Sequence, residues 1–181
     1  MSEARIPAEQ YERYMQEFTA NAYDPKDWAR RAKRAGMKYV VLTAKHHDGF
    51  CLFDSRLTEY KSTNAPCGRD LVREFVDAVR AEGLRVGLYY SLIDWHHPDF
   101  PKFSDLNHPM RGNPAYQDEK IDFDRYLAYM HGQIEELVTN YGKIDILWFD
   151  YAYDELRGEA WKATELIQMV RRHQPDVVID N

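Results

Sequence analysis

Several features are scarce in this chain of 181 residues. Two cysteines, Cys51 and Cys67, are too few for a disulfide framework, so we expect a reducing compartment and a cytoplasmic location. No apolar run approaches the roughly 18 residues of a membrane helix, and the first residues include no apolar stretch typical of a signal peptide. Acidic residues outnumber basic ones by 30 to 24, and the net charge of -6 disfavours nucleic acid or anionic membranes as the main partner.

Glycine-rich phosphate-binding motifs are also missing. Neither G-x-G-x-x-G nor G-x-x-x-x-G-K-S/T occurs, which disfavours a dinucleotide or nucleoside triphosphate site. The residues that are present are typical of a folded domain, because 44% are hydrophobic and 30% are charged. The length fits one domain that buries about 70% of its unfolded surface.

Helical and strand patterns alternate along the chain. Asp24 followed by Pro25 is typical of a helix start. Helix ends are expected at three glycines, Gly36, Gly83 and Gly142. Short apolar runs between the helical stretches predict buried strands. We expect helices over about 7–18, 25–35, 70–82, 121–141 and 161–174, and strands over 37–44, 84–90, 144–150 and 177–179.

This alternation predicts parallel β-α-β units with right-handed crossovers. An open doubly wound sheet and a (β/α)8 barrel both have that pattern. The polar residues favour the barrel, because they follow the strands, at the edge where barrel enzymes hold their catalytic groups. The strings concerned are KHHDGF from Lys45, SLIDWHHPDF from Ser91 and WFDY from Trp148.

Four strands are only half of a barrel, which takes about 250 residues when complete. A half barrel exposes two strand edges and one apolar sheet face. We therefore expect either a fragment or an assembly in which a second copy or another segment covers them. Residues 91–118 form a long connection with four prolines, which favours a lid, a binding loop or an insertion.

His46 and His47 follow the first predicted strand. A histidine there is able to hydrogen-bond a ligand hydroxyl or to exchange a proton near neutral pH. The alternative, of equal weight, is that the pair anchors its loop. If the strand continues through the pair, only one of the two rings points inward, because side chains alternate along a strand.

The second strand end is rich in aromatic residues. Trp95, together with Tyr89 or Tyr90, is a candidate to stack on a sugar ring. His96 and His97 fit an ordinary solvated loop at least as well as a binding role.

Asp150 closes the third apolar strand beside Trp148. A carboxylate in such surroundings costs free energy unless it is paired or functional. We favour a nucleophilic or acid-base role for Asp150 over a helix-capping role.

Together these strings resemble the catalytic domain of α-L-fucosidases of glycoside hydrolase family 29. The resemblance extends from about Tyr11 to Asn181 and rests on YVVLTAKHHDGF, GRDLV, GLYYSLIDWHHPDF and YGKIDILWFD, in matching order and spacing. It implies one incomplete (β/α)8-type domain over 1–181, with a helical lead-in over 1–36 and four β-α repeats over 37–181. It also implies retaining hydrolysis of α-L-fucosides without a metal or organic cofactor.

By this resemblance Asp150 corresponds to the nucleophile at the end of the fourth barrel strand, where a covalent fucosyl-enzyme forms. His46 and His47 match a fucose-binding histidine pair, and Trp148 matches a tryptophan that lines the pocket. One of the two adjacent tyrosines matches a pocket tyrosine, and we expect Tyr90, which lies nearer the strand end.

Two parts of the family pattern are absent from this sequence. No early strand with an F-x-H-W-G-like string precedes Tyr11, and the family's acid/base carboxylate comes from a region beyond Asn181. Retaining glycosidases need that second carboxyl group about 5–5.5 Å from the nucleophile. The acidic residues near the rim each have an ordinary loop or capping explanation: Asp48, Asp94, Asp99, Asp154 and Glu155.

The sequence thus predicts a truncated or split fucosidase that acts on a fucosylated glycan or small fucoside, as a homo-oligomer or with a complementing barrel half. A fucose-binding half barrel without catalysis is the main alternative. Two others are a structural assembly module and a metal-dependent hydrolase. The metal site would combine His46 or His47, His96 or His97, and Asp150, although no H-x-H pair supports it.

Overall fold

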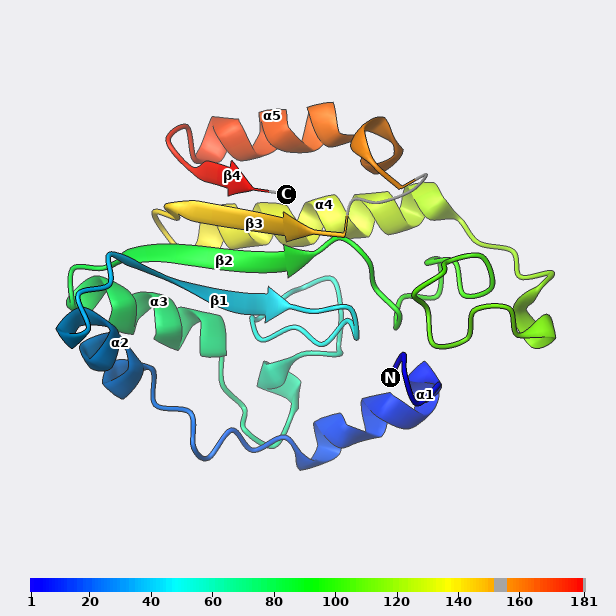
Figure 1. The fold of residues 1–181 in the computed structure, drawn as a ribbon, viewed down its shortest axis with the longest axis horizontal. Helices are drawn as coiled ribbons and strands as arrows, with labels where there is room; N and C mark the ends of the chain where they lie inside the picture. The colour runs from blue at the N-terminus through cyan, green and yellow to red at the C-terminus, as the bar shows by residue number, and fades with distance from the viewer. Residues whose placement is uncertain (152–155, 181) are drawn as a thin grey trace.

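Four strands form one parallel sheet, and their order in space is their order in the sequence (Figure 1). The structure is a computed structural model and describes residues 1–151 and 156–180. Its strands are β1 (Tyr39–Lys45), β2 (Arg85–Ser91), β3 (Ile146–Asp150) and β4 (Val178–Asp180). Each strand pairs in parallel with the next.

Three helices, α3 (Leu71–Ala81), α4 (Phe123–Asn140) and α5 (Ala163–His173), connect successive strands and cover one face of the sheet, while the opposite face is open (Figure 1). Two helices, α1 (Ala8–Tyr11) and α2 (Pro25–Arg34), precede β1, and 3-10 segments lie at Glu12–Glu17, Ser62–Asn64, Pro114–Tyr116 and Gly158–Trp161. A doubly wound sheet has helices on both faces and a reversal of strand order. Sequential order with one covered face is the arrangement of consecutive barrel units, so the predicted partial (β/α)8 barrel is confirmed.

Aspartate side chains begin three of these helices. The carboxylates of Asp24, Asp70 and Asp122 each accept the backbone N–H three residues further on. They thereby satisfy donors that no helical carbonyl reaches. Gly36 ends α2 with a φ of 81°, a left-handed conformation that a glycine adopts without side-chain strain. The helices predicted over 25–35, 70–82 and 121–141 are confirmed to within two residues. Among the described residues, no helix is both long and apolar enough to cross a membrane.

The pleat of the sheet separates a buried set of side chains from an exposed set. Leu88 and Leu147 are fully buried on the face that the helices cover. On the opposite face Tyr39, Trp148 and Val178 are 54%, 43% and 60% exposed. This second set points to the side that forms the interior in a closed barrel. The half barrel therefore presents an open, largely apolar inner face.

Strand β1 differs from the prediction at its carboxyl end. The strand extends to Lys45, and its register with β2 shifts between Thr43 and Lys45. Thr43 pairs with Tyr89, whereas Lys45 pairs with Tyr90, so one extra residue is accommodated. Consecutive residues Ala44 and Lys45 are both buried as a result. The irregularity directs Lys45 into the interior of the protein instead of onto the open face.

The N-terminal segment lies against the long connection 91–118. The Ser2 hydroxyl donates to the Asn107 carbonyl at 2.8 Å, and the Arg5 guanidinium donates to the Arg111 carbonyl at 3.1 Å. The single helix predicted over 7–18 is instead one α-helical turn followed by a 3-10 segment. Neither piece contains a buried residue, so no apolar packing favours a continuous α-helix there.

Leu88→Ala is expected to lower the free energy of unfolding by about 2–5 kcal/mol, because a fully buried leucine leaves a cavity between β2 and the helices. Leu106→Ala is the matched control, since Leu106 is 69% exposed and its loss should cost less than about 0.5 kcal/mol. Urea titration measures both variants. Equal losses would show that the sheet–helix layer is not the core of the fold.

Candidate active site

Asp150 lies at the carboxyl end of β3 with both carboxylate oxygens occupied by hydrogen bonds. The Tyr89 hydroxyl, from the neighbouring strand β2, donates to Oδ2 at 2.6 Å. The backbone N–H of Tyr151 donates to Oδ1 at 2.8 Å. Tyr151 has a φ of 71°, an uncommon conformation for a residue with a side chain. Such strain concentrates at functional sites, and here it accompanies the donation of the Tyr151 N–H to the carboxylate.

Both histidines of the KHHDGF string lie beside the cluster formed by Asp150, Tyr89 and Tyr151. The His46 ring stacks on Tyr89 with the centroids 5.7 Å apart and the planes 12° apart. The His47 ring lies 3.7 Å from the His46 ring and contacts the Tyr151 ring edge-on at 4.1 Å. Because β1 ends at Lys45, the alternation of a strand does not send one of the two rings away. The condition under which only one ring would point inward, a strand that continues through the pair, is therefore not met.

The choice of Tyr90 as the pocket tyrosine is also corrected by the structure. Tyr90 is fully buried on the helix-covered face, and its hydroxyl donates to Gln133 of α4 at 2.7 Å. Tyr89 is its neighbour on the opposite face, as the pleat requires. The tyrosine that contacts Asp150 is therefore Tyr89, and position nearer the strand end was the wrong criterion.

The two predicted tryptophans lie on different sides of the cluster. Trp148 is exposed on the inner face, 5.8 Å from the Tyr89 ring. Trp95 is buried with its ring 5.1 Å from that of His47, and its indole N–H has no hydrogen-bond partner among the described residues. His108, itself buried, faces the Trp95 backbone carbonyl through Nε2 at 3.4 Å. The structure thus brings Asp150, both histidines and both tryptophans together; their roles toward a ligand stay predictions.

Three histidines of this region, His46, His47 and His108, have lowered pKa values. Desolvation and the neighbouring His46 ring lower the pKa of His47 to about 3. Desolvation also lowers the pKa of His46, against the opposing carboxylates of Asp48 and Asp150. Burial lowers the pKa of His108 to about 4. At neutral pH these rings are therefore neutral groups that donate one hydrogen bond and accept another.

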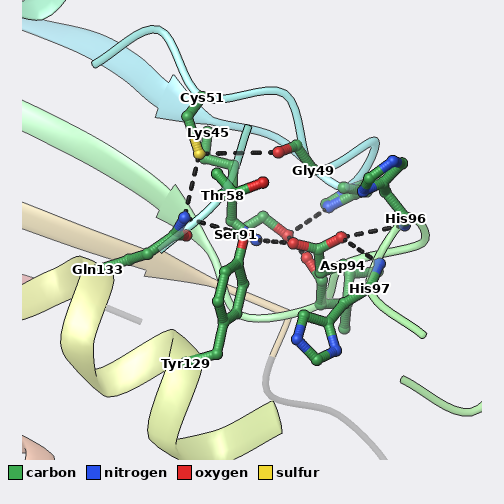
Figure 2. Close-up of polar contacts among 12 residues, drawn as sticks. Lys45, Gly49, Cys51, Thr58, Ser91, Asp94, His96, His97, Tyr129 and Gln133 are labelled. Atoms are coloured by element: carbon green, nitrogen blue, oxygen red, sulfur yellow. Dashed lines mark hydrogen bonds and ion pairs between the residues drawn. The ribbon is translucent and has the colours of Figure 1, made fainter. Parts of the chain in front are cut away.

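A buried ion pair lies behind the site and joins the ends of β1 and β2 (Figure 2). Lys45 Nζ is 2.9 Å from Asp94 Oδ2, and both side chains are at most 1% exposed. Burial alone would raise the pKa of Asp94, but the Lys45 ammonium holds it below its usual value. The other oxygen, Oδ1, accepts the backbone N–H groups of His96 and His97 at 3.0 and 2.9 Å.

The loop after β1 is held to the loop after β2 around this pair. Gly49 has a φ of 80°, and a Cβ atom there would lie 2.5 Å from Oδ1 of Asp94. Only glycine allows so close an approach. In addition, the backbone N–H of Trp95 donates to the backbone carbonyl of His47 at 2.7 Å. The ion pair, the glycine and this backbone bond together position His47 and Trp95.

The remaining acidic candidates for a proton donor have other partners or lie elsewhere. Asp94 is paired with Lys45, and Asp99 is bonded by the Arg125 guanidinium, which lowers its pKa. Burial raises the pKa of Asp48, while the Phe50 N–H opposes the shift. Asp154 and Glu155 lie outside the described residues. None of the three described carboxyl groups is in contact with Asp150, so the structure assigns no acid.

The residues of the metal-site alternative are not brought together. His96 stacks on Tyr60 and faces a carboxylate oxygen of Glu12 at 2.9 Å. His97 lies against the Tyr129 ring of α4 at 4.5 Å. Over 1–151 and 156–180, no group of three or more His, Cys, Asp or Glu side chains has the arrangement of a metal site.

Sequence reasoning missed several residues that shape the site: Lys45, Tyr151, Ser91 and Gln133. A lysine at the end of an apolar strand was a usable signal, because a buried ammonium requires a partner. Gln133 had no such signal, since it is one polar residue among the mostly apolar buried positions of α4. Its side chain contacts Cys51 and Tyr129 behind the ion pair (Figure 2). Tyr151 acts through its backbone, which residue type does not reveal.

Comparisons with known proteins agree with this geometry. A family model described as Alpha-L-fucosidase matches residues 2–181. The structure of α-L-fucosidase isoenzyme 1 from Paenibacillus thiaminolyticus is 63% identical and covers 99% of this chain and 43% of that one, with a TM-score of 0.98. The tissue α-L-fucosidase of Rattus norvegicus is 32% identical over all of this chain and 37% of its own length.

A third relative was solved in a reacted state. It is an α-L-fucosidase of glycoside hydrolase family 29 from Bacteroides thetaiotaomicron, captured as a trapped covalent intermediate with 2-fluoro-fucosyl fluoride. It is 34% identical, with a TM-score of 0.81, and the match covers 97% of this chain and 38% of that one. The chain thus spans less than half the length of each of these three proteins.

Lys45→Met is expected to lower the free energy of unfolding at pH 7 by about 3–5 kcal/mol, because it leaves the Asp94 carboxylate buried without its cation. The exposed pair of Lys162 with Asp124 supplies the control, and Lys162→Met should cost less than about 1 kcal/mol. Because pairing depresses the pKa of Asp94, the Lys45 contribution is present above about pH 4 and is lost as the pH falls through the lower folded value. Urea titrations of both variants measure this, and equal losses at pH 7 would contradict it.

His108→Gln is expected to make the stability less sensitive to acid. Between about pH 6.5 and 4 the unfolded chain protonates this histidine while the buried ring stays neutral. The unfolded state therefore binds more protons, and the free energy of unfolding decreases as the pH is lowered. The variant should lose about 1–2 kcal/mol less than the wild type between pH 7 and 5. An unchanged pH dependence in His108→Gln would refute the assignment.

Proposed function

The chain belongs to the α-L-fucosidase family, and from that premise we propose that it supplies the nucleophile side of a retaining fucosidase site. The observation that carries the proposal is the Asp150 carboxylate, held by two donors at a strand end beside two neutral histidines. Two hydrogen bonds to a carboxylate fix its direction, as a nucleophile requires.

In the proposed reaction, one oxygen of Asp150 attacks the anomeric carbon of an α-L-fucoside and the glycosidic C–O bond breaks. A second carboxyl group protonates the leaving oxygen and later takes a proton from the water that releases fucose. The covalent intermediate reported for the Bacteroides thetaiotaomicron relative supports this route. Tyr89 would release part of its bond to Asp150 as the charge on the carboxylate is consumed.

The proposed site also needs an acid and the strands that close the barrel. The exposed inner face at Tyr39, Trp148 and Val178 favours additional strands that close a barrel over it. We propose a complementing barrel half or a second copy as their source, and as the source of the acid. Without such a partner the same cluster suits the alternative function, binding of fucose without turnover. A cytoplasmic location stays a prediction from the two cysteines.

A fluorinated fucosyl fluoride tests the nucleophile independently of the acid. Fluoride leaves without protonation, so intact mass spectrometry should show one fucosyl adduct on the chain, and peptide mapping should place it on Asp150. Asp150→Ala should lower the labelling rate by at least about 10³-fold. Asp77→Ala, at an exposed position of α3, is the matched control and should label normally.

Hydrolysis of an aryl α-L-fucoside, measured with the size of the same sample, then separates the two functions. Labelling with turnover supports a complete site in that assembly, and labelling without turnover supports a chain that needs its other half. An adduct that persists in Asp150→Ala would refute the nucleophile assignment.

A further inference from the structure

The Ser91 hydroxyl, at the carboxyl end of β2, has two partners inside the protein. Its Oγ lies 2.6 Å from Nδ1 of His47 and 2.8 Å from the backbone carbonyl oxygen of Ile93. Ser91 and Ile93 are fully buried. A carbonyl oxygen only accepts hydrogen bonds, so the single hydroxyl proton of Ser91 is donated to Ile93.

His47 must then be the donor in its own bond to Ser91. The hydroxyl offers only lone pairs toward the ring, so the hydrogen of the neutral imidazole lies on Nδ1 and the lone pair lies on Nε2. In the opposite arrangement Ser91 donates to His47, and the Ile93 carbonyl is left without a donor among the described residues. An unsatisfied buried carbonyl is destabilising, which favours the first arrangement.

The surroundings of His47 keep the ring neutral and leave Nε2 available. The groups that face it are His46, Lys45, Asp150, Trp95, Tyr151 and Ser91. Burial and the His46 ring lower the pKa of His47 far enough that the ring carries one hydrogen over the whole neutral range. Within the described residues no group forms a hydrogen bond with Nε2, on the far side of the ring from Ser91.

We propose that Ser91 is a positioning residue that fixes His47 as the Nδ1–H tautomer, so that Nε2 accepts a hydrogen bond from a hydroxyl group of the bound sugar. The sugar's identity rests on the proposed function, whereas the tautomer does not. A ligand that presents a hydroxyl to Nε2 is accepted, and one that presents a carbonyl or carboxylate oxygen there meets a lone pair. Ser91 thus contributes to specificity without touching the ligand.

Nitrogen NMR of the chain labelled with ¹⁵N-histidine tests the tautomer directly. The His47 signals, identified by their loss in His47→Gln, should show a protonated Nδ1 and an unprotonated Nε2 throughout pH 6–8. Ser91→Ala should abolish this preference, and Ser91→Thr, which keeps the hydroxyl, should restore it. Ser55→Ala removes another fully buried serine, which bonds Gln133, and should leave the His47 signals unchanged. A protonated Nε2 in the wild type overturns the proposal, even if Ser91→Ala fails to fold.

Titration with L-fucose tests the acceptor role. Binding should shift the unprotonated Nε2 resonance in the direction of a nitrogen that accepts a hydrogen bond, and Ser91→Ala should weaken binding by about fivefold. Ser91→Thr should bind within about twofold of the wild type. Binding without any change at Nε2 overturns the acceptor role. If the tautomer is as expected and L-fucose does not bind, the sugar assignment of the proposed function fails while the action of Ser91 on His47 stands.

Discussion

The buried ion pair between Lys45 and Asp94 determines how two loops of the candidate site meet. Each charge is stable in the interior only because of the other, so the ends of β1 and β2 are held at one separation. Asp94 also accepts two backbone N–H groups, which fixes the direction in which its loop leaves the strand. The positions of His47 and Trp95 follow from these bonds and from the backbone bond between the two residues.

The pleat of the sheet assigns each residue of the site to one of two environments. Tyr89 and Tyr90 are adjacent in the sequence, yet one contacts Asp150 and the other contacts Gln133 of α4. On β3, Trp148 and Asp150 face the inner side, and Phe149 between them is buried against the helices. A shift of one residue in either strand would exchange these environments, so strand register and site geometry are specified together.

Local signals predicted most of the fold and part of the site. Asp24 before Pro25 and Gly36 after the helix are chemical signals that act within a few residues, and the structure agrees with them. The polar residues after each strand indicated the edge where Asp150 and the histidines meet. The bond between Lys45 and Asp94 joins residues 49 positions apart, and the register shift beside Lys45 depends on its pairing with β2. No short window of sequence contains information on such distant contacts. The error at Tyr90 has the same cause, because its partner Gln133 lies 43 positions away.

The sequential strand order has a consequence for how the chain reaches its fold. Within 1–151 and 156–180, every strand pairs only with strands adjacent in the sequence, so sheet contacts are able to form in the order in which a ribosome releases the residues. When β2 emerges, β1 is already available as a template. In the same way β2 is available when β3 emerges, and β3 when β4 emerges. Loop closure at each step spans one helix and its linkers, which limits the entropy lost before a pairing is gained. The growing edge is also the place where an unfinished chain is open to aggregation.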